Sequence, residues 1–193
     1  VTRNGVGSAA PGSRSICVFC GSAAGASPAY RVAATQLGRE IGRRGWRLVY
    51  GGASVGLMGE VADAALAAGA EVVGVITPGL VDKEVAHGGL TQLVVEPTMA
   101  ARKTTMFELS DAVVVLPGGF GTLDELFEAI TLNQLGDMAM PVVLVDTDGF
   151  WQPLLAAVDA LVDAGFVSAA NRSLLHVVAT PADALAATAS PWV

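Results

Sequence analysis

The sequence is poor in cysteine, in histidine and in cationic residues. Its 193 residues include 2 Cys, 2 His and 11 Lys and Arg against 18 Asp and Glu, so the formal net charge is −7. A chain this acidic repels polyanions, which disfavours nucleic-acid binding and favours a small ligand. No apolar run reaches the roughly 18 residues of a membrane span, and the first residues lack the apolar core of a signal peptide. We therefore expect a cytoplasmic protein with no membrane or nucleic-acid partner.

The two cysteines form a C-x-x-C pair, Cys17 and Cys20, a spacing that can indicate zinc or redox chemistry. Residues 16–20 have the pattern of a strand, in which side chains alternate between two faces. Residues an odd number apart then point to opposite faces and cannot share a metal or a disulfide. A zinc site also needs about four ligands, and only His87 and His176 could join the pair. We expect two small buried residues, no metal site and no cofactor.

Apolar segments and helical patterns alternate along the chain. The composition, 52% hydrophobic and 15% charged, is that of a packed globular protein, and the length suits one domain. We expect a disordered tail at residues 1–14 and a single domain at residues 15–193. The strand segments are nearly continuous apolar runs, which is typical of strands buried on both faces. The predicted fold class is α/β: a Rossmann-like, doubly wound, mostly parallel sheet with helices on both faces.

Three glycine-bearing loops follow three of the predicted strands. They read CGSAAG, YGGASVG and LPGGFGT, at residues 20–25, 50–56 and 116–122. In a doubly wound sheet the carboxyl ends of the strands share one edge, and ligands bind outside that edge. Three such loops at one edge predict a place where the main chain approaches a ligand closely.

The third loop has the chemistry of an anion site. Gly118, Gly119 and Gly121 lack Cβ atoms, so their N–H groups can approach an anion. A helix predicted from about Thr122 would add its positive end. No lysine follows the last glycine, as a triphosphate-binding Walker loop needs, and no G-x-G-x-x-G fingerprint of a dinucleotide site is present. A monophosphate suits the loop best.

The acid behind this loop, Glu125, can be interpreted in two ways. Thr122 and Glu125 have the spacing of a capping box, in which Glu125 would accept a hydrogen bond from the N–H of Thr122. Alternatively, a carboxylate beside a bound sugar phosphate can stabilise an oxocarbenium-like centre or activate water, as in enzymes that break glycosidic bonds. Asp124, one position earlier, is expected to face solvent. The residues alone leave both roles of Glu125 open.

The loop sequence PGGFGTLDE resembles the P-G-G-x-G-T-x-x-E motif of the LOG (Lonely guy) family of cytokinin-activating enzymes. MAARK, at residues 99–103, is similar to that family's M-x-x-R-K, and VFCGS, YGGASVGLMG and GVIT match further blocks in the same order. The similarity runs from about Ser15 to about Ala187. Ala100 stands where members often have His, and Ala53 where many have Gly or Ser. Members are often labelled lysine decarboxylases, but this chain shows no lysine context for pyridoxal phosphate.

The resemblance implies a phosphoribohydrolase that cleaves the N-glycosidic bond of N6-modified adenosine 5′-monophosphates to free base and ribose 5-phosphate. It implies Arg102 and Glu125 as the catalytic pair, although adjacent helix cations such as Arg102 and Lys103 are more often solvated. Arg102 would either orient Glu125 or offset charge on the leaving base. Two alternatives stay open: a hydrolase of plain AMP or other nucleoside monophosphates, and a nucleotide-binding or carrier module without turnover.

The resemblance and the loops together give the expected substrate contacts. The glycine loop would hold the phosphate, and Gly21, Ser22 and Met99 would lie near the base. The full expected set is Gly21, Ser22, Gly51, Gly52, Glu84, Met99, Lys103, Gly118, Gly119, Gly121 and Thr122. Because family members are dimers or larger, we also expect a homodimer. Six apolar residues could supply its interface, or equally the core: Met99, Met106, Phe107, Leu123, Leu126 and Phe127.

Overall fold

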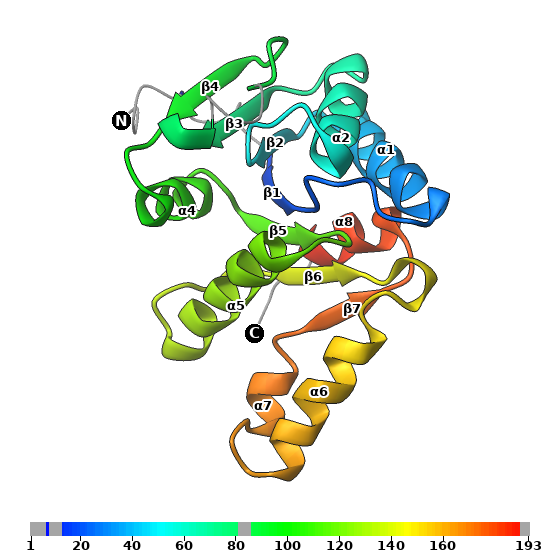
Figure 1. Ribbon diagram of the computed structural model, residues 1–193, viewed down its shortest axis with the longest axis vertical. Helices are drawn as coiled ribbons and strands as arrows, with labels where there is room; N and C mark the ends of the chain where they lie inside the picture. Colours follow the sequence, from blue (N-terminus) through cyan, green and yellow to red (C-terminus); the bar gives the residue numbers. More distant parts are fainter. Residues whose placement is uncertain (1–6, 8–12, 81–85, 190–193) are drawn as a thin grey trace.

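The computed structural model describes residue 7, residues 13–80 and residues 86–189. Its sheet has seven strands in the order β4-β3-β2-β1-β5-β6-β7, and every neighbouring pair is parallel (Figure 1). The strands are β1 (Ser15–Phe19), β2 (Arg47–Tyr50), β3 (Val72–Ile76), β4 (Gln92–Val95), β5 (Ala112–Val115), β6 (Val142–Val145) and β7 (His176–Val178). The predicted parallel, doubly wound sheet is confirmed.

Helices cover both faces of this sheet (Figure 1). One buried cluster joins strand side chains to α1, α2 and α8, and a second joins the opposite strand faces to α4, α5 and α6. The helices are α1 (Pro28–Arg43), α2 (Gly56–Ala67), α4 (Met99–Glu108), α5 (Phe120–Leu135), α6 (Gln152–Asp163), α7 (Ala169–Arg172) and α8 (Pro181–Ala189), with a 3₁₀ turn η1 (Thr147–Gly149). None of the described helices is long and apolar enough to cross a bilayer.

The two cysteines lie on opposite sides of the sheet, as the strand alternation predicts. Cys17 belongs to the cluster under α4, α5 and α6, whereas Cys20 belongs to the cluster under α1, α2 and α8. Both are buried and free. Burial raises the pKa of each thiol well above its usual value, so neither is a reactive thiolate at neutral pH.

The beginning and end of α1 follow the local sequence signals. Ser27 is the N-cap, and its side-chain oxygen accepts a hydrogen bond from the N–H of Ala29 at 3.2 Å. Pro28 occupies the first helical position, where its missing N–H costs nothing. Gly45 follows the C-cap residue Arg44 with a φ of 65°, a left-handed conformation that glycine adopts without strain.

The expected disordered tail, residues 1–14, lies largely outside the described residues. At its end, the Ser13 hydroxyl donates to the carbonyl of Gly45 at 2.6 Å, and the Arg14 guanidinium donates to the carbonyl of Thr188. Residues 13 and 14 therefore contact the folded domain.

The sheet order places a crevice beside the middle strand. The chain runs from β1 to β2 on one side, and β5 pairs with the other side of β1. The loops that follow β1 and β5 thus leave the sheet in opposite directions, which is the point where doubly wound sheets bind ligands. Helix α5 begins directly after β5, so its amino-terminal end faces this crevice.

Candidate active site

The glycine loops that follow β1 and β5 are joined by main-chain hydrogen bonds. The N–H of Gly21 donates to the carbonyl of Pro117 at 3.0 Å, and the N–H of Leu57 donates to the carbonyl of Gly21 at 3.0 Å. The second bond ties the first turn of α2, which follows the β2 loop, to the same place. The structure therefore brings the three predicted loops together at one edge of the sheet.

The loop between β5 and α5 combines one tightly packed glycine with two open ones. A Cβ atom on Gly118 would lie 2.1 Å from Thr122 Oγ1 and 2.9 Å from the main-chain nitrogen of Gly21, so only glycine fits there. A Cβ atom on Gly119 or Gly121 would meet no atom of a neighbouring segment within 4 Å. Because the first N–H groups of a helix have no partner within it, α5 presents free donors on an open side of the loop.

Helix α5 begins earlier than the sequence suggested, and this changes the role of Glu125. Its N-cap is Gly119, which makes no side-chain cap bond, whereas the capping-box hypothesis required Thr122 at that position. Thr122 is instead the third helical residue, and Glu125 lies one turn further on. The capping-box interpretation of Glu125 is wrong, because its carboxylate bonds to a residue of another helix.

That partner is Arg102, from α4. Its side chain is buried, and its three nitrogens are directed at three different acceptors. Nη1 donates to Glu125 Oε1 at 3.0 Å, Nε donates to the carbonyl of Val75 at 2.8 Å, and Nη2 points at the carbonyl of Gly51 at 3.4 Å. The alternative of a solvated helix cation is therefore wrong for Arg102.

Gly51, in the β2 loop, leaves room for this guanidinium. A Cβ atom on Gly51 would lie 2.4 Å from Arg102 Nη2. The second loop thus contributes to the site by admitting Arg102 next to its main chain.

Glu125 carries a perturbed carboxyl group. It is 8% exposed, and burial raises its pKa, which the Arg102 charge and hydrogen bond oppose and the charge of Asp124 reinforces. A buried acid with a raised pKa and one fixed charged partner is a frequent sign of a functional site. The arrangement provides a carboxylate whose proton affinity is shifted towards neutral pH.

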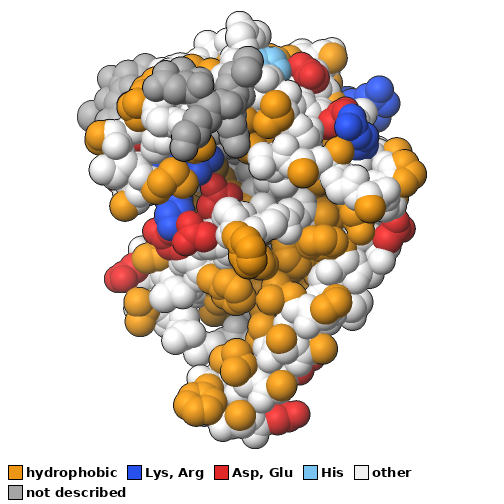
Figure 2. Space-filling view, in the orientation of Figure 1, with side chains coloured by type: hydrophobic (Ala, Val, Ile, Leu, Met, Phe, Trp, Pro, Cys, Tyr) orange, Lys and Arg blue, Asp and Glu red, His pale blue; other side chains and the backbone are white. Residues whose placement is uncertain are grey.

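A second group of charges lies on the outer side of the same two helices. Lys103 Nζ contacts Asp124 Oδ2 at 2.9 Å and also the carboxylate of Glu128. The side chain of Asp124 is 59% exposed, which agrees with its expected solvent-facing position. Figure 2 shows acidic and basic side chains gathered in this way on one face.

A pocket of about 300 Å³ opens beside the glycine loops. Gly21, Ser22, Gly118 and Gly119, all expected substrate contacts, line it. Its apolar lining includes three residues that sequence reasoning missed: Tyr30, Leu57 and Phe150. These come from α1, α2 and the segment after β6, and no spacing in the sequence links them.

The expected contacts Gly52, Met99 and Lys103 do not line this pocket. Gly52 has a φ of 79°, and its carbonyl accepts from the N–H of His87 at 3.0 Å. Met99 is 44% exposed at the first position of α4, one turn before Arg102. Lys103 is held by the outer carboxylates, and Glu84 lies outside the described residues.

The fold and this geometry define a class of protein. An open anion cradle at the crevice of a Rossmann-like sheet, with a buried acid one helical turn behind it, is a site for a phosphorylated ligand on which chemistry is done. Comparison with known proteins gives the particular family.

The family described as "Possible lysine decarboxylase" matches residues 58–188. The chain is 44% identical over 184 residues to the cytokinin riboside 5′-monophosphate phosphoribohydrolase of Rhodococcoides fascians, covering 95% of this chain and 93% of that protein. It is 43% identical to an Arabidopsis thaliana protein of the same name, covering 84% of this chain and 76% of that protein. The chain belongs to the LOG family of cytokinin riboside 5′-monophosphate phosphoribohydrolases, as its motifs predicted.

Solved structures of a related group share the fold. The molybdenum cofactor carrier protein of Chlamydomonas reinhardtii superimposes with a TM-score of 0.69 at 28% identity, covering 91% of this chain and 95% of that chain. The molybdenum cofactor binding protein of Rippkaea orientalis gives a TM-score of 0.69 at 25% identity, covering 91% and 94%. One scaffold therefore occurs both in proteins named as hydrolases and in proteins named as carriers.

Proposed function

We propose that this protein hydrolyses the N-glycosidic bond of N6-modified adenosine 5′-monophosphates, releasing the free base and ribose 5-phosphate. The observation that carries the proposal is the buried Arg102–Glu125 pair beside an open glycine loop. The family membership supports the same reaction, since relatives at 43–44% identity are named for it.

The glycine loop would anchor the 5′-phosphate. The free N–H groups of the first turn of α5, at Phe120, Gly121 and Thr122, point their dipoles at the same anion. Phosphate binding far from the reacting bond fixes the anomeric carbon in place and converts binding energy into orientation.

Glu125 would act at the anomeric carbon C1′. As the bond between C1′ and the base nitrogen breaks, its electron pair leaves with the base, and positive charge develops on the ribose. The carboxylate of Glu125 stabilises that charge and accepts a proton from the attacking water, whose oxygen bonds to C1′. The proton returns to the departing base, so the atoms of water divide between the two products.

Arg102 would serve as a positioning residue. Three of its five N–H groups already face Glu125, Val75 and Gly51, which holds the guanidinium in one orientation. The guanidinium fixes one oxygen of Glu125 and keeps part of the carboxylate population ionised against the desolvation that raises its pKa. These contacts favour a role for Arg102 in orienting Glu125 over a role in offsetting charge on the leaving base.

The decarboxylase description fits the chain poorly. The chain contains two lysines, Lys83 and Lys103, and a Schiff base with pyridoxal phosphate needs a neutral amine. Partial burial lowers the pKa of Lys103, but the carboxylates of Glu128 and Asp124 raise it more, so this pKa lies above its usual value. Lys83 lies outside the described residues.

The decisive experiment pairs two carboxylate-to-amide changes on α5. Purified wild type, Glu125→Gln and Glu128→Gln are incubated with isopentenyladenosine monophosphate, AMP and isopentenyladenosine, and free base is measured by chromatography. We expect base release from the monophosphates only, a loss of at least about 10²-fold in Glu125→Gln, and near-normal turnover in Glu128→Gln. Nucleotide binding and folding should persist in both variants.

The outcomes separate the alternatives. Faster hydrolysis of AMP than of the N6-modified nucleotide would assign the enzyme to plain nucleoside monophosphates. Tight nucleotide binding with no base released would favour a carrier, which the likeness to the molybdenum cofactor proteins makes the second candidate. Normal turnover in Glu125→Gln would remove Glu125 from the chemistry.

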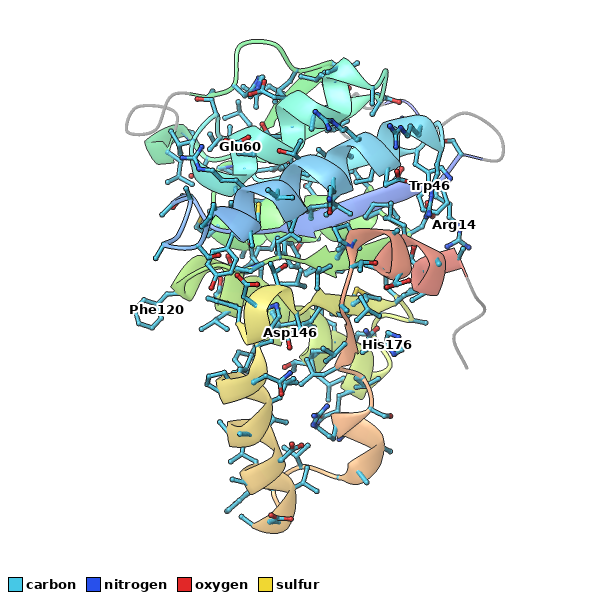
Figure 3. The ribbon with its side chains drawn as sticks, turned by 90° about the vertical axis from the view of Figure 1, so that its right-hand side faces the viewer. Arg14, Trp46, Glu60, Phe120, Asp146 and His176 are labelled. Carbon is cyan, nitrogen blue, oxygen red and sulfur yellow. The ribbon has the colours of Figure 1, made fainter. Side chains whose placement is uncertain are left out.

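Two further expectations stay predictions: a homodimer and a cytoplasmic location. Of the six apolar residues considered for an interface, Met106, Phe107 and Leu126 are buried in the core, whereas Met99 and Phe127 are more than 40% exposed. Phe120 is 92% exposed and projects from the start of α5 (Figure 3). Sedimentation of the purified protein tests the dimer, and cell fractionation tests the location.

A further inference from the structure

His87 contacts both the loop that follows β2 and helix α2. We propose that His87 is a positioning residue for the Arg102–Glu125 pair, because it holds the β2 loop in the place from which that loop orients Arg102. This inference rests on the proposed function and deepens it, since it names a further residue on which the same reaction depends.

The ring of His87 uses both of its nitrogens. Nδ1 accepts a hydrogen bond from the N–H of Gly89 at 3.1 Å, and Nε2 lies 3.0 Å from Asp63 Oδ1 on α2. Because Nδ1 accepts, the network assigns the ring proton to Nε2, which donates it to the carboxylate, so the neutral imidazole satisfies both partners. The side chain of His87 is 11% exposed, whereas that of Asp63 is 74% exposed. A mostly covered ring thus fastens its own segment to the outer side of α2.

The main chain of the same segment is bonded to the β2 loop. The N–H of His87 donates to the carbonyl of Gly52 at 3.0 Å, and Ala86 forms an antiparallel bridge with Ala53. On its other side the loop packs on β3, since a Cβ atom on Gly74 would lie 2.7 Å from Gly52 Cα. The β2 loop is therefore held between β3 and the segment that begins at Ala86.

The position of this loop matters to Arg102. The carbonyl of Gly51 lies 3.4 Å from Arg102 Nη2, and a Cβ atom on Gly51 would lie 2.4 Å from the same nitrogen. This contact is longer than the bonds of Arg102 to Val75, 2.8 Å, and to Glu125, 3.0 Å. It is therefore the first of the three to be lost when the loop moves away. A loop held in place keeps the guanidinium directed at Glu125.

Helix α2 gives His87 a fixed point of attachment. Its first turn is bonded to the β1 loop, because the N–H of Leu57 donates to the carbonyl of Gly21 at 3.0 Å. Its inner face belongs to the buried cluster that it shares with α1 and α8. The bond between His87 and Asp63 thus connects the β2 loop to a helix that is itself packed on the sheet.

The test separates the two bonds of the ring. His87→Gln places an amide N–H near the position of Nε2 and keeps a donor for Asp63, whereas His87→Asn keeps an acceptor near Nδ1 but does not reach Asp63. Asp63→Ala removes the same bond from the exposed side, where a substitution leaves the fold intact. Glu60→Ala is the matched control, because Glu60 lies one turn earlier on α2 and pairs with Arg31 at the surface (Figure 3).

Two quantities are measured for each variant: turnover of isopentenyladenosine monophosphate, and hydrogen exchange of the Arg102 Nε–H by NMR, assigned by comparison with Arg102→Met. In His87→Asn and Asp63→Ala we expect kcat to fall about 10- to 100-fold, with KM within about twofold of wild type. Exchange of the Nε–H should be about 10-fold faster, as expected from the loss of one hydrogen bond to a charged group. His87→Gln and Glu60→Ala should keep wild-type values of all three. A residue that only stabilised the fold would not separate kcat from KM.

The results that overturn the inference differ from the one that overturns the proposed function. Unchanged Nε–H exchange in His87→Asn and Asp63→Ala refutes the inference, and so does faster exchange with an unchanged kcat. Equal losses in His87→Gln and His87→Asn refute it as well, because the bond to Asp63 is then not what holds the loop. Thermal unfolding checks each variant, and Asp63→Ala decides alone if His87→Asn does not fold. If the wild type releases no base from any monophosphate, the hydrolase fails, and the exchange of the Arg102 Nε–H still decides whether His87 positions the guanidinium.

Discussion

Replacing Arg102 with methionine should destabilise the protein in a pH-dependent way. Methionine keeps much of the side-chain volume but removes the guanidinium, so the Glu125 carboxylate is left buried without its ionic partner. The carbonyls of Val75 and Gly51 lose a donor as well. The solvated position considered for Arg102 from the sequence would give little change in stability, so this experiment tests the burial of Arg102 that the structure shows.

The size of the effect follows from the burial of the pair. The side chains of Arg102 and Glu125 are 7% and 11% exposed, so solvent screens them little. Removing one member of a buried ion pair typically costs about 3–5 kcal/mol, because the other charge remains desolvated. For a domain of this size that corresponds to a fall in melting temperature of roughly 10 °C. The protein should still fold, since domains are typically stable by about 5–15 kcal/mol.

The pH dependence comes from Glu125. Its pKa is already raised by burial, and Arg102 is the main influence that lowers it, so the pKa rises further in Arg102→Met. An acid whose pKa is higher in the folded than in the unfolded protein stabilises the fold below its unfolded pKa, and this contribution is lost as pH rises through the folded pKa. The destabilisation relative to wild type should therefore be larger at pH 8 than at pH 6.

Urea unfolding of wild type, Arg102→Met and the double variant Arg102→Met/Glu125→Gln at the two pH values measures this directly. The double variant removes the buried charge, so it should recover part of the lost stability at pH 8 and lose the pH dependence. Equal destabilisation of Arg102→Met at both pH values, or no recovery in the double variant, would refute the assignment of Glu125 as the uncompensated charge.

Two further predictions use the same region. The acidic limb of the pH profile of kcat/KM should reflect the raised pKa of Glu125. Asp124→Asn removes a charge that raises this pKa, so it should move the limb to lower pH, whereas an Asp159→Asn control should leave it in place. A limb that does not move in Asp124→Asn contradicts the assignment. Gly118→Ala should lower the melting temperature by several degrees, because its Cβ atom would overlap Thr122 Oγ1. Gly121→Ala meets open space within a helix, so it should keep the melting temperature or raise it slightly. Scanning calorimetry measures both, and equal melting temperatures would show that the close packing at Gly118 is unimportant.

Much of the fold could be predicted because each strand carries its own signal. Runs such as residues 112–116 and 142–145 are apolar without alternation, and this is expected only where both faces are covered. The start of α1 could be predicted equally well, since a serine followed by proline fits the first positions of a helix. These features depend on neighbours in the sequence, so no knowledge of distant contacts is needed.

The apolar lining of the pocket beside the glycine loops could not be predicted, because it comes from distant segments. Tyr30, Leu57 and Phe150 each follow a different strand, and each has a spacing that core packing would explain. The positive φ of Asp148 is likewise a property of the folded segment. Whether an apolar residue lines a pocket or fills a core is decided by packing between segments, which periodicity does not report.

The spacing of the glycine motif acquires a physical explanation once α5 begins at Phe120. Residues three apart in a helix share a face, so Thr122 and Glu125 both point inward, 3% and 8% exposed. Thr122 packs against Gly118 in the loop between β5 and α5, while Glu125, one turn further along, reaches Arg102 on α4. Asp124 falls on the opposite face and pairs with Lys103 in the outer cluster. A threonine and a glutamate three positions apart thus place the proposed phosphate loop and a buried acid on one helix face, one turn apart. In the proposed binding mode, this separation would keep the carboxylate on the ribose side of the ligand, where its charge does not oppose phosphate binding.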